Sequence, residues 1–318
     1  MRLAAPARNG AELWLKNDGL SHAVYGGNKV RKLERIFADL GEARPRLLTL
    51  GAAGSHHVLT TALFGKARGL RVAAVFVPQL RTPHVEATLR ASLGQGVEAY
   101  AAGGYAGVPL AFARAFRPGD HVIPPGASNL AGALAYADAA LELAAQVRAG
   151  DLPEPDLVVV AVGSGGTAAG LLAGLAQSGL RARVHGVLVL ARPFVRRQIG
   201  RLASAAVRAN GARVSAAELS ARLELDSGAI GDGYGCATDE AERARAFARQ
   251  EHNLELDLTY TAKAFARALA LAAKPPAGVR TVLYWHTLSA RPLEPLLDGA
   301  PSLDELQPSL RRLLVAPR

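Results

Sequence analysis

The chain has 318 residues, of which 50% are hydrophobic and 20% are charged, and this balance predicts a globular protein with a sizeable core. The net charge of +10 is dispersed, and no basic stretch is interleaved with aromatic residues, so we predict a solvated or anion-attracting surface and no nucleic-acid partner. The single cysteine, Cys236, excludes an intramolecular disulfide and a zinc site built from paired cysteines.

Short apolar runs alternate along the chain with stretches of helical periodicity. Several runs are continuously apolar, which is typical of strands buried on both faces of a parallel sheet. The predicted strands are Leu13–Lys16, Leu47–Leu50, Val72–Val77, Val97–Ala101, His121–Ile123, Leu157–Val162, Val184–Leu190 and Val282–His286. The predicted helices are Val30–Leu40, His57–Arg68, Pro83–Leu93, Leu130–Arg148, Thr167–Gln177, Pro193–Arg208, Asp239–Glu251 and Thr261–Ala272. The alternation predicts an α/β fold with parallel-rich twisted sheets flanked by helices.

Two stretches that contain Gly and Pro, 41–45 and 124–126, bracket a group of compact strand–helix steps. We therefore predict a smaller inserted α/β domain over residues 45–126. Residues 1–44 and 127–318 are predicted to form the larger, cofactor-binding domain.

The longest charge-free stretch, 157–180, is long enough to raise the question of a membrane span. A glycine-rich turn interrupts it, so a buried strand, turn and helix is the better interpretation. The residues that follow Arg2 include no long apolar segment, so we predict no secretory signal and a cytoplasmic location.

A lysine directly follows a glycine pair and an asparagine in Tyr25-Gly26-Gly27-Asn28-Lys29-Val30-Arg31-Lys32-Leu33-Glu34, where a helical pattern begins. Glycines let backbone and ligand approach closely, so Lys29 lies at an accessible corner between loop and helix. Only six of the 37 Lys and Arg residues are lysines. A desolvated amine can lose its proton and form an imine, which a guanidinium cannot do, so this placement indicates covalent chemistry at Lys29.

A second glycine-rich turn, Gly163-Ser164-Gly165-Gly166-Thr167, lies between an apolar strand and an apolar helix. Its glycines allow an anion to approach the backbone, and free N–H groups at the start of the helix donate to it. The hydroxyl groups of Ser164 and Thr167 add further donors. The turn therefore predicts a phosphate site.

Two kinds of phosphate ligand fit this turn. Residues 163–168 match a loose dinucleotide fingerprint, but no Asp or Glu occurs between positions 157 and 217, which disfavours NAD. Arg192 could meet the 2′-phosphate of NADP, so an NADP-dependent reductase is an alternative. A phosphate monoester combined with an imine-forming lysine needs fewer assumptions and predicts pyridoxal 5′-phosphate as the cofactor.

Together, the motifs at 26–34 and 163–167 resemble those of the D-cysteine desulfhydrase and 1-aminocyclopropane-1-carboxylate deaminase family. The resemblance extends from Leu13 to Thr287 and implies the two-domain, tryptophan-synthase-β-like architecture of fold type II pyridoxal-phosphate enzymes, and a homodimer. Weaker matches are Gly126-Ala127-Ser128-Asn129, Gly233-Tyr234-Gly235, Thr238-Asp239-Glu240-Ala241, Leu256-Asp257-Leu258-Thr259-Tyr260-Thr261-Ala262-Lys263-Ala264 and His286-Thr287.

The resemblance also implies roles for single residues. Lys29 would form the Schiff base and move the α-proton of the substrate, and Thr287 would place a neutral hydroxyl near the pyridine nitrogen. Ser55 would face the substrate carboxylate, and Tyr234 would lie against the cofactor or substrate. The implied cofactor contacts are Asn28, Lys29, His56, Gly163, Ser164, Gly165, Gly166, Thr167 and Thr287.

Three departures from the family pattern fall near the expected ring and substrate contacts. His56 stands where the family has asparagine, Ala237 where it has proline, and Leu288-Ser289 where it has two glycines. Cofactor binding is therefore the firmer prediction and substrate identity the weaker one. His56 and His57 are adjacent on a predicted helix, so their side chains diverge, and we predict no metal site.

The resemblance implies a lyase or deaminase of a small amino acid. D-cysteine-like α,β-elimination to keto acid, ammonia and sulfide is the first expectation, and ring opening of the cyclopropane amino acid is the second. The alternatives are the NADP-dependent reductase and a catalytically weakened family member with a binding role. Lys32 is expected on a helix surface or at an interface, Lys263 on a helix surface, and Tyr260 either in the core or in an active-site wall.

Overall fold

The computed structural model describes residues 1–3 and 10–316, which form two compact units. The larger unit is drawn from Met1–Arg35 and Ser128–Arg291, and the smaller unit from Ile36–Ala127 and Pro292–Arg318. The C-terminal segment from Pro292, which we assigned to the larger domain from the sequence, thus groups with the smaller unit. Pairing of Leu314–Val315 with Gln79–Leu80 is one reason for this grouping.

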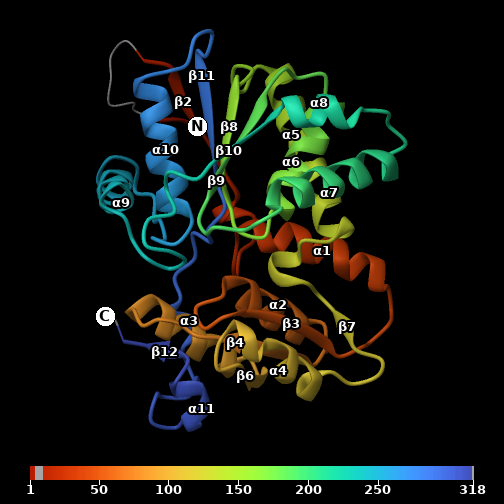
Figure 1. Ribbon diagram of the computed structural model, residues 1–318, viewed down its shortest axis with the longest axis vertical. Coiled ribbons are helices and arrows are strands. Elements are labelled where there is room, and N and C mark those ends of the chain that lie inside the picture. Colours follow the sequence, from red (N-terminus) through yellow and green to blue (C-terminus); the bar gives the residue numbers. More distant parts are fainter. Residues whose placement is uncertain (4–9, 317–318) are drawn as a thin grey trace. The chain divides into compact units, whose positions relative to one another are not determined.

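The larger unit is built on a six-stranded sheet in the order β1-β2-β11-β8-β9-β10 (Figure 1). Only the β1–β2 pair is antiparallel, and the other four pairs are parallel. The strands are β1 (Arg2–Leu3), β2 (Glu12–Asn17), β8 (Leu157–Val162), β9 (Arg183–Leu188), β10 (Leu223–Asp226) and β11 (Thr281–His286). The predicted parallel-rich sheet is therefore confirmed for this unit.

Helices cover both faces of this sheet because successive strand residues point to opposite sides. Val158, Val160 and Val162 of β8 pack in one core with α5, α6 and α7, whereas Leu157 and Val159 pack in another with α9 and α10. Figure 1 shows the two groups of helices on either side of the strands. The helices are α5 (Leu130–Ala149), α6 (Gly166–Gln177), α7 (Val195–Ala209), α8 (Ala216–Ala221), α9 (Asp239–His252) and α10 (Thr261–Ala273).

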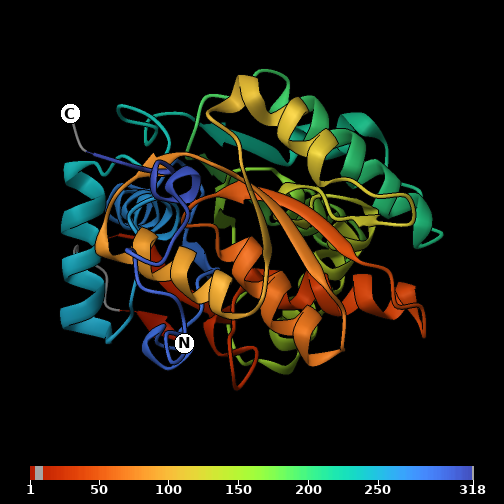
Figure 2. The ribbon, with the colours of Figure 1, turned by 90° about the horizontal axis from the view of Figure 1, so that it is seen from below.

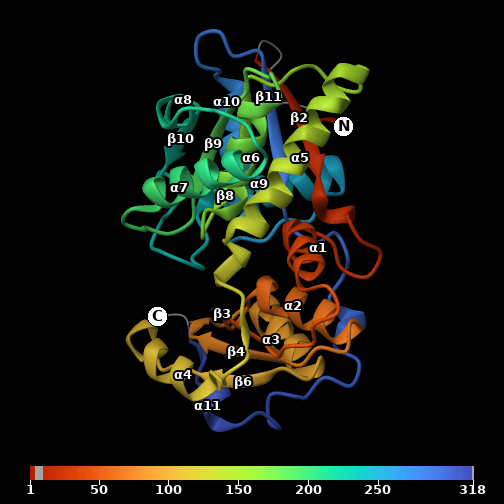
Figure 3. The same ribbon diagram turned by 90° about the vertical axis from the view of Figure 1, so that its right-hand side faces the viewer.

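The smaller unit contains a four-stranded parallel sheet in the order β6-β4-β3-β7, and a two-stranded parallel pair β12-β5. Helices α2 and α4 pack against the strands, and α3 lies beside α2 (Figures 2 and 3). Its strands are β3 (Leu47–Ala52), β4 (Val72–Val77), β5 (Gln79–Leu80), β6 (Glu98–Ala101), β7 (His121–Val122) and β12 (Leu314–Val315). Its helices are α2 (His56–Ala67), α3 (Pro83–Gly94), α4 (Val108–Ala115) and α11 (Pro308–Arg311).

All eight predicted strands and all eight predicted helices are present, with ends shifted by at most two residues. The elements that the sequence did not predict are short: β1, β5, β10, β12, α4, α8 and α11. Helix α1 (Asn28–Leu40) begins at the glycine pair, as predicted, and its residues up to Arg35 belong to the larger unit.

Within the described residues, one helix, α5, has the length and composition that a membrane span requires. More than half of its most apolar window is buried inside the fold, as in the core helix of a globular unit, so this is weak evidence for a span. The charge-free stretch at 157–180 forms β8, the glycine turn and α6, which confirms the interpretation as strand, turn and helix.

Candidate active site

The glycine pair before Lys29 is packed so closely that no side chain fits. A Cβ on Gly26 would lie 2.0 Å from the carbonyl oxygen of Gly19, and a Cβ on Gly27 would lie 2.7 Å from that of Thr287. Gly27 also has a φ of +93°, a conformation that favours glycine. The pair therefore fixes the start of α1, and with it Lys29, against the end of β11.

Hydrogen bonds hold the same corner in place. The N–H group of Asn28 donates to the carbonyl oxygen of Thr287 at 3.1 Å, and that of Gly26 donates to Ser289 Oγ at 3.0 Å. Ser289 Oγ also accepts from the N–H group of Arg291 at 3.1 Å. Ser289 is one of the departures from the family pattern, and in this chain its hydroxyl anchors the lysine-bearing loop.

Lys29 is connected through Asn28 to the glycine turn. Its Nζ donates to Asn28 Oδ1 at 2.8 Å, and Asn28 Nδ2 donates to Thr167 Oγ1 at 3.1 Å. Burial lowers the pKa of Lys29 to about 8, and the negative charge of Asp257 opposes that shift. The two motifs that the sequence singled out therefore meet, and the amine between them gives up its proton more readily than an ordinary lysine.

The glycine turn leaves the start of α6 without a side-chain cap. Gly165 takes the N-cap position in a left-handed conformation, with φ of +89°, and has no side chain of its own to cap the helix. Ser128 Oγ donates to Ser164 Oγ at 2.6 Å and accepts from the N–H group of Gly166 at 3.1 Å. The remaining N–H groups of the first helical turn have no partner within the helix, so they are available to an anion.

Two tyrosines lie at this turn. A Cβ on Gly163 would lie 2.9 Å from Cε1 of Tyr260, so the ring packs directly against the turn. The hydroxyl groups of Tyr260 and Tyr234 are hydrogen-bonded at 2.8 Å. Asp257 fixes Tyr260 by accepting from its N–H group at 2.7 Å. Tyr260 thus lies in a wall of the candidate site, and its place in the matched motif at 256–264 was the signal available in the sequence.

The end of β11 adds a buried histidine. Burial lowers the pKa of His286 to about 4, so the imidazole is neutral over the physiological pH range. Its Nδ1 is hydrogen-bonded to the hydroxyl of Tyr284 at 3.2 Å. Its Nε2 is buried and has no hydrogen-bond partner among the described residues. Thr287 follows and is half-buried, and its carbonyl oxygen is the acceptor for Asn28.

Ser55 and His56 lie in the smaller unit, at the start of α2. Ser55 caps this helix, because its Oγ accepts from the N–H group of Val58 at 3.3 Å. His56 Nε2 lies 2.8 Å from Nε2 of His84 on α3, whereas His57 turns into the core and bonds Thr49 Oγ1 at 2.8 Å. The two adjacent histidines therefore diverge as predicted. The described residues contain no group of three or more His, Cys, Asp or Glu side chains that could hold a metal ion.

Two expectations for charged side chains need correction. Lys32 and Lys263 are each only 1% exposed. Lys32 Nζ lies 5.6 Å from the ring centroid of Tyr136, and burial lowers the pKa of Lys32 well below the ordinary value. Lys263 Nζ donates to the carbonyl oxygen of Ile230 at 2.8 Å. Arg192, considered above for the 2′-phosphate of NADP, donates to the carbonyl oxygen of Gly163 at 3.3 Å.

This fold and site define a pyridoxal-phosphate enzyme. A family model described as "Pyridoxal-phosphate dependent enzyme" matches residues 2–287, so the chain belongs to that family. The predicted cofactor is therefore confirmed, and the NADP-dependent reductase is excluded as an interpretation of the glycine turn.

Within this family the chain is similar to D-cysteine desulfhydrase from Klebsiella pneumoniae (strain 342), with 31% identity covering 95% of this chain and 90% of the relative. It is also 34% identical to nocardicin C-9′ epimerase from Nocardia uniformis subsp. tsuyamanensis, over 87% of this chain and 86% of that protein. The crystal structure of an ACC deaminase homologue matches with a TM-score of 0.75 and 26% identity, covering 91% of this chain and 89% of the other. The resemblance to the desulfhydrase and deaminase family, and the fold type II architecture, are thereby confirmed.

The residues present in the larger unit fit the cofactor. The α6 start offers N–H donors without a side-chain cap, which suits a phosphate group. Lys29, whose pKa is lowered to about 8, is linked to that turn through Asn28 and suits attachment of an aldehyde.

Proposed function

We propose that this protein is a lyase that eliminates a β-leaving group from a small amino acid, with D-cysteine as the first candidate substrate. The products are then a keto acid, ammonia and sulfide. The single observation that carries the proposal is the hydrogen-bonded link from Lys29 through Asn28 to Thr167. The 31% identity to D-cysteine desulfhydrase over almost the whole chain supports this choice of substrate class.

When bound, pyridoxal phosphate holds the substrate amino group and takes up the electrons released at the α-carbon. Lys29 Nζ, with its lowered pKa, accepts the α-proton at that carbon. Asn28 Oδ1 accepts a hydrogen bond from Nζ and thereby orients the amine. The turn at 163–167 binds the phosphate through its N–H groups and the hydroxyls of Ser164 and Thr167.

Tyr234 and Tyr260 form one side of the proposed site. Their hydrogen-bonded hydroxyl groups place a proton donor beside the glycine turn, where the leaving group or the substrate carboxylate can receive it. Thr287 is proposed to place its neutral hydroxyl at the ring nitrogen. Ser55 is proposed as the contact of the substrate carboxylate and His56 as a cofactor contact, and both proposals are based on the family resemblance.

The test is an assay of the purified, cofactor-loaded protein with D-cysteine, L-cysteine and 1-aminocyclopropane-1-carboxylate. We expect sulfide, ammonia and keto acid to form in equal amounts from D-cysteine. Ammonia and keto acid from the cyclopropane amino acid alone would establish the deaminase alternative. Cofactor binding with no product from any of the three, and no exchange of the α-hydrogen, would establish a weakened family member with a binding role.

A second candidate reaction is epimerisation at an α-carbon, which the 34% identity to nocardicin C-9′ epimerase favours. This reaction needs proton removal and return but no leaving group. It predicts exchange of the α-hydrogen with deuterated water without release of ammonia. Mass spectrometry of the recovered amino acid distinguishes the two reactions in one experiment.

The location and assembly of the protein stay proposals. We propose a cytoplasmic enzyme that forms a homodimer. Sedimentation analysis of the loaded protein tests the dimer, and a mass of one chain at micromolar concentration would contradict it.

A further inference from the structure

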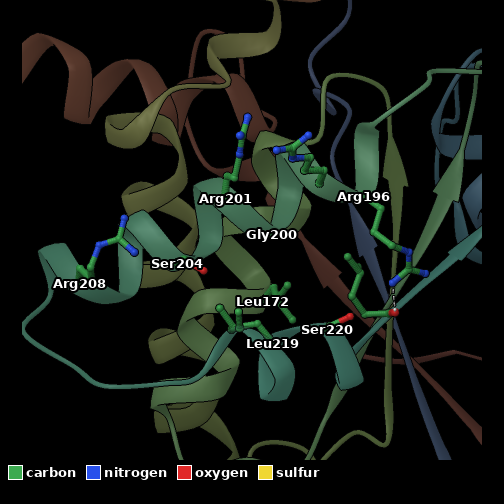
Figure 4. Close-up of a pocket in the computed structure, with 11 residues that line it drawn as sticks. Leu172, Arg196, Gly200, Arg201, Ser204, Arg208, Leu219 and Ser220 are labelled. Atoms are coloured by element: carbon green, nitrogen blue, oxygen red, sulfur yellow. Dashed lines mark hydrogen bonds between the residues drawn. The ribbon is translucent and has the colours of Figure 1, made fainter.

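A pocket of about 400 Å³ opens beside α7, and four arginines line it (Figure 4). Arg197, Arg201 and Arg208 are spaced by four and seven residues, so they lie on one face of the helix. The fourth, Arg196, donates to the carbonyl oxygen of Leu223 at 3.0 Å. Figure 4 shows Arg196, Arg201 and Arg208 on different sides of the hollow.

These arginines have no acidic partner. Among the described residues, no ion pair joins any of the four to an Asp or Glu, and the nearby Glu218 pairs with Arg222 at 3.4 Å instead. Arg197 and Arg201 stand four residues apart on the helix, a spacing at which like charges repel. An anion held between them removes that repulsion.

The inner part of the pocket has a different character. Leu172 from α6, Leu219 from α8 and Leu223 from β10 form an apolar floor. The hydroxyl-bearing residues Ser204 and Ser220 also line the pocket. Small-molecule sites typically combine apolar walls with a few placed polar groups in about 300–1,000 Å³. The lining thus suits a ligand with an apolar body and a charged end.

Gly200, in the middle of α7, keeps the pocket open. A Cβ at this position would meet no atom within 4 Å, so no packing contact requires a glycine here. Glycine in a helix interior is less stable than alanine. A side chain at position 200 would project into the pocket that this residue lines.

We propose that this pocket binds a small organic anion that carries two or more phosphate groups on an apolar or aromatic body. The phosphates bind at Arg197 and Arg201. A second hollow of about 610 Å³ shares these two arginines and includes Phe194, a residue that is 78% exposed. The paired arginines therefore lie where two hollows of the same unit meet, as expected of the charged centre of a ligand site.

The experiment is calorimetric titration of the cofactor-loaded protein with ADP, inorganic pyrophosphate and adenosine. We expect ADP and pyrophosphate to bind, ADP more tightly because its base covers the apolar floor, and adenosine not to bind. The double variant Arg197→Ala/Arg201→Ala is expected to weaken ADP binding at least tenfold. The matched control is Arg243→Ala/Arg249→Ala on α9, which removes the same charge from exposed arginines that pair with Glu240 and Glu255.

A substitution that leaves every arginine in place distinguishes binding of ADP inside the pocket from nonspecific attraction of ADP to the surface charge. Gly200→Leu is expected to fill the hollow and weaken ADP binding at least tenfold, whereas Gly200→Ala leaves it within about twofold. Absence of saturable binding of ADP and pyrophosphate would overturn the proposal. So would an equal loss of affinity in the α9 control, or unchanged affinity in Gly200→Leu.

Discussion

Two helices of this protein, α6 and α2, each follow a parallel strand and a turn, but they begin in opposite ways. At the start of α6, Gly165 occupies the N-cap position and offers no side-chain acceptor, and Ser128 Oγ accepts from the N–H group of Gly166, so the next N–H groups of the first turn stay available. At the start of α2, Ser55 accepts from the N–H group of Val58 and so satisfies one of the first-turn donors from within the chain. The first arrangement is suited to an external anion, and the second is already capped. The difference supports the proposal that the phosphate binds in the larger unit, although both helices follow parallel strands.

Substitution of Lys29 is expected to have the largest effect. Lys29→Ala removes the amine that we propose attaches the cofactor and accepts the α-proton, and activity should fall by roughly 10²–10⁴-fold. Lys29→Arg should lose as much, because the guanidinium keeps its proton. Initial rates with D-cysteine at saturating cofactor provide the measurement. A variant that retained a tenth of the activity would contradict the assignment of Lys29.

The start of α6 offers the second test. Gly166→Ala would place a Cβ 2.5 Å from Ser128 Oγ, and Gly165→Ala would hold alanine at a φ of +89°. Both changes should weaken cofactor binding at least tenfold, which corresponds to about 1.4 kcal/mol. Fluorescence titration with pyridoxal phosphate gives the dissociation constants. The control is Gly179→Ala beyond the end of α6, where φ is +82° but a Cβ meets no atom within 4 Å; an equal effect there would show general destabilisation.

The third prediction concerns pH. In the cofactor-free protein Lys29 has a pKa lowered to about 8, so the unprotonated fraction rises as pH increases through 8. The rate at which pyridoxal phosphate attaches should rise with this fraction and level off above pH 9. A midpoint near the ordinary lysine value of about 10.4 would show that burial does not shift Lys29. Stopped-flow absorbance between pH 6 and 10.5 separates the two results.

Substitution of Ser55, which caps α2, is expected to have the smallest effect. Ser55→Ala removes the cap of α2 and should lower the free energy of unfolding by about 1 kcal/mol. Ser55→Asn keeps a capping side chain and should restore most of that stability. Cofactor affinity should stay unchanged in both variants, whereas a proposed contact to the substrate carboxylate predicts a raised KM in each. Urea unfolding and steady-state kinetics measure the two effects independently.

The sequence was sufficient to predict the long helices and strands and the two motifs at 26–34 and 163–167, because continuous apolar runs and glycine turns carry strong local signals. It did not predict short elements such as β10 and α8, because the pairing of this strand and the packing of this helix depend on neighbours elsewhere in the chain. It also placed Lys32 and Lys263 on the surface, since buried lysines are rare and nothing local marks them. The sequence left Tyr260 open between the core and an active-site wall, because the packing of its ring against Gly163 is a contact between distant parts of the chain.

The most direct test of the central claim is borohydride reduction of the cofactor-loaded protein followed by peptide mapping. We predict one pyridoxyl group, on Lys29 in the peptide that contains Gly26-Gly27-Asn28-Lys29. Lys32 lies three residues away, so fragmentation must resolve the two. A pyridoxyl group on Lys32, Lys263 or any other lysine, or no incorporation at all, would contradict it.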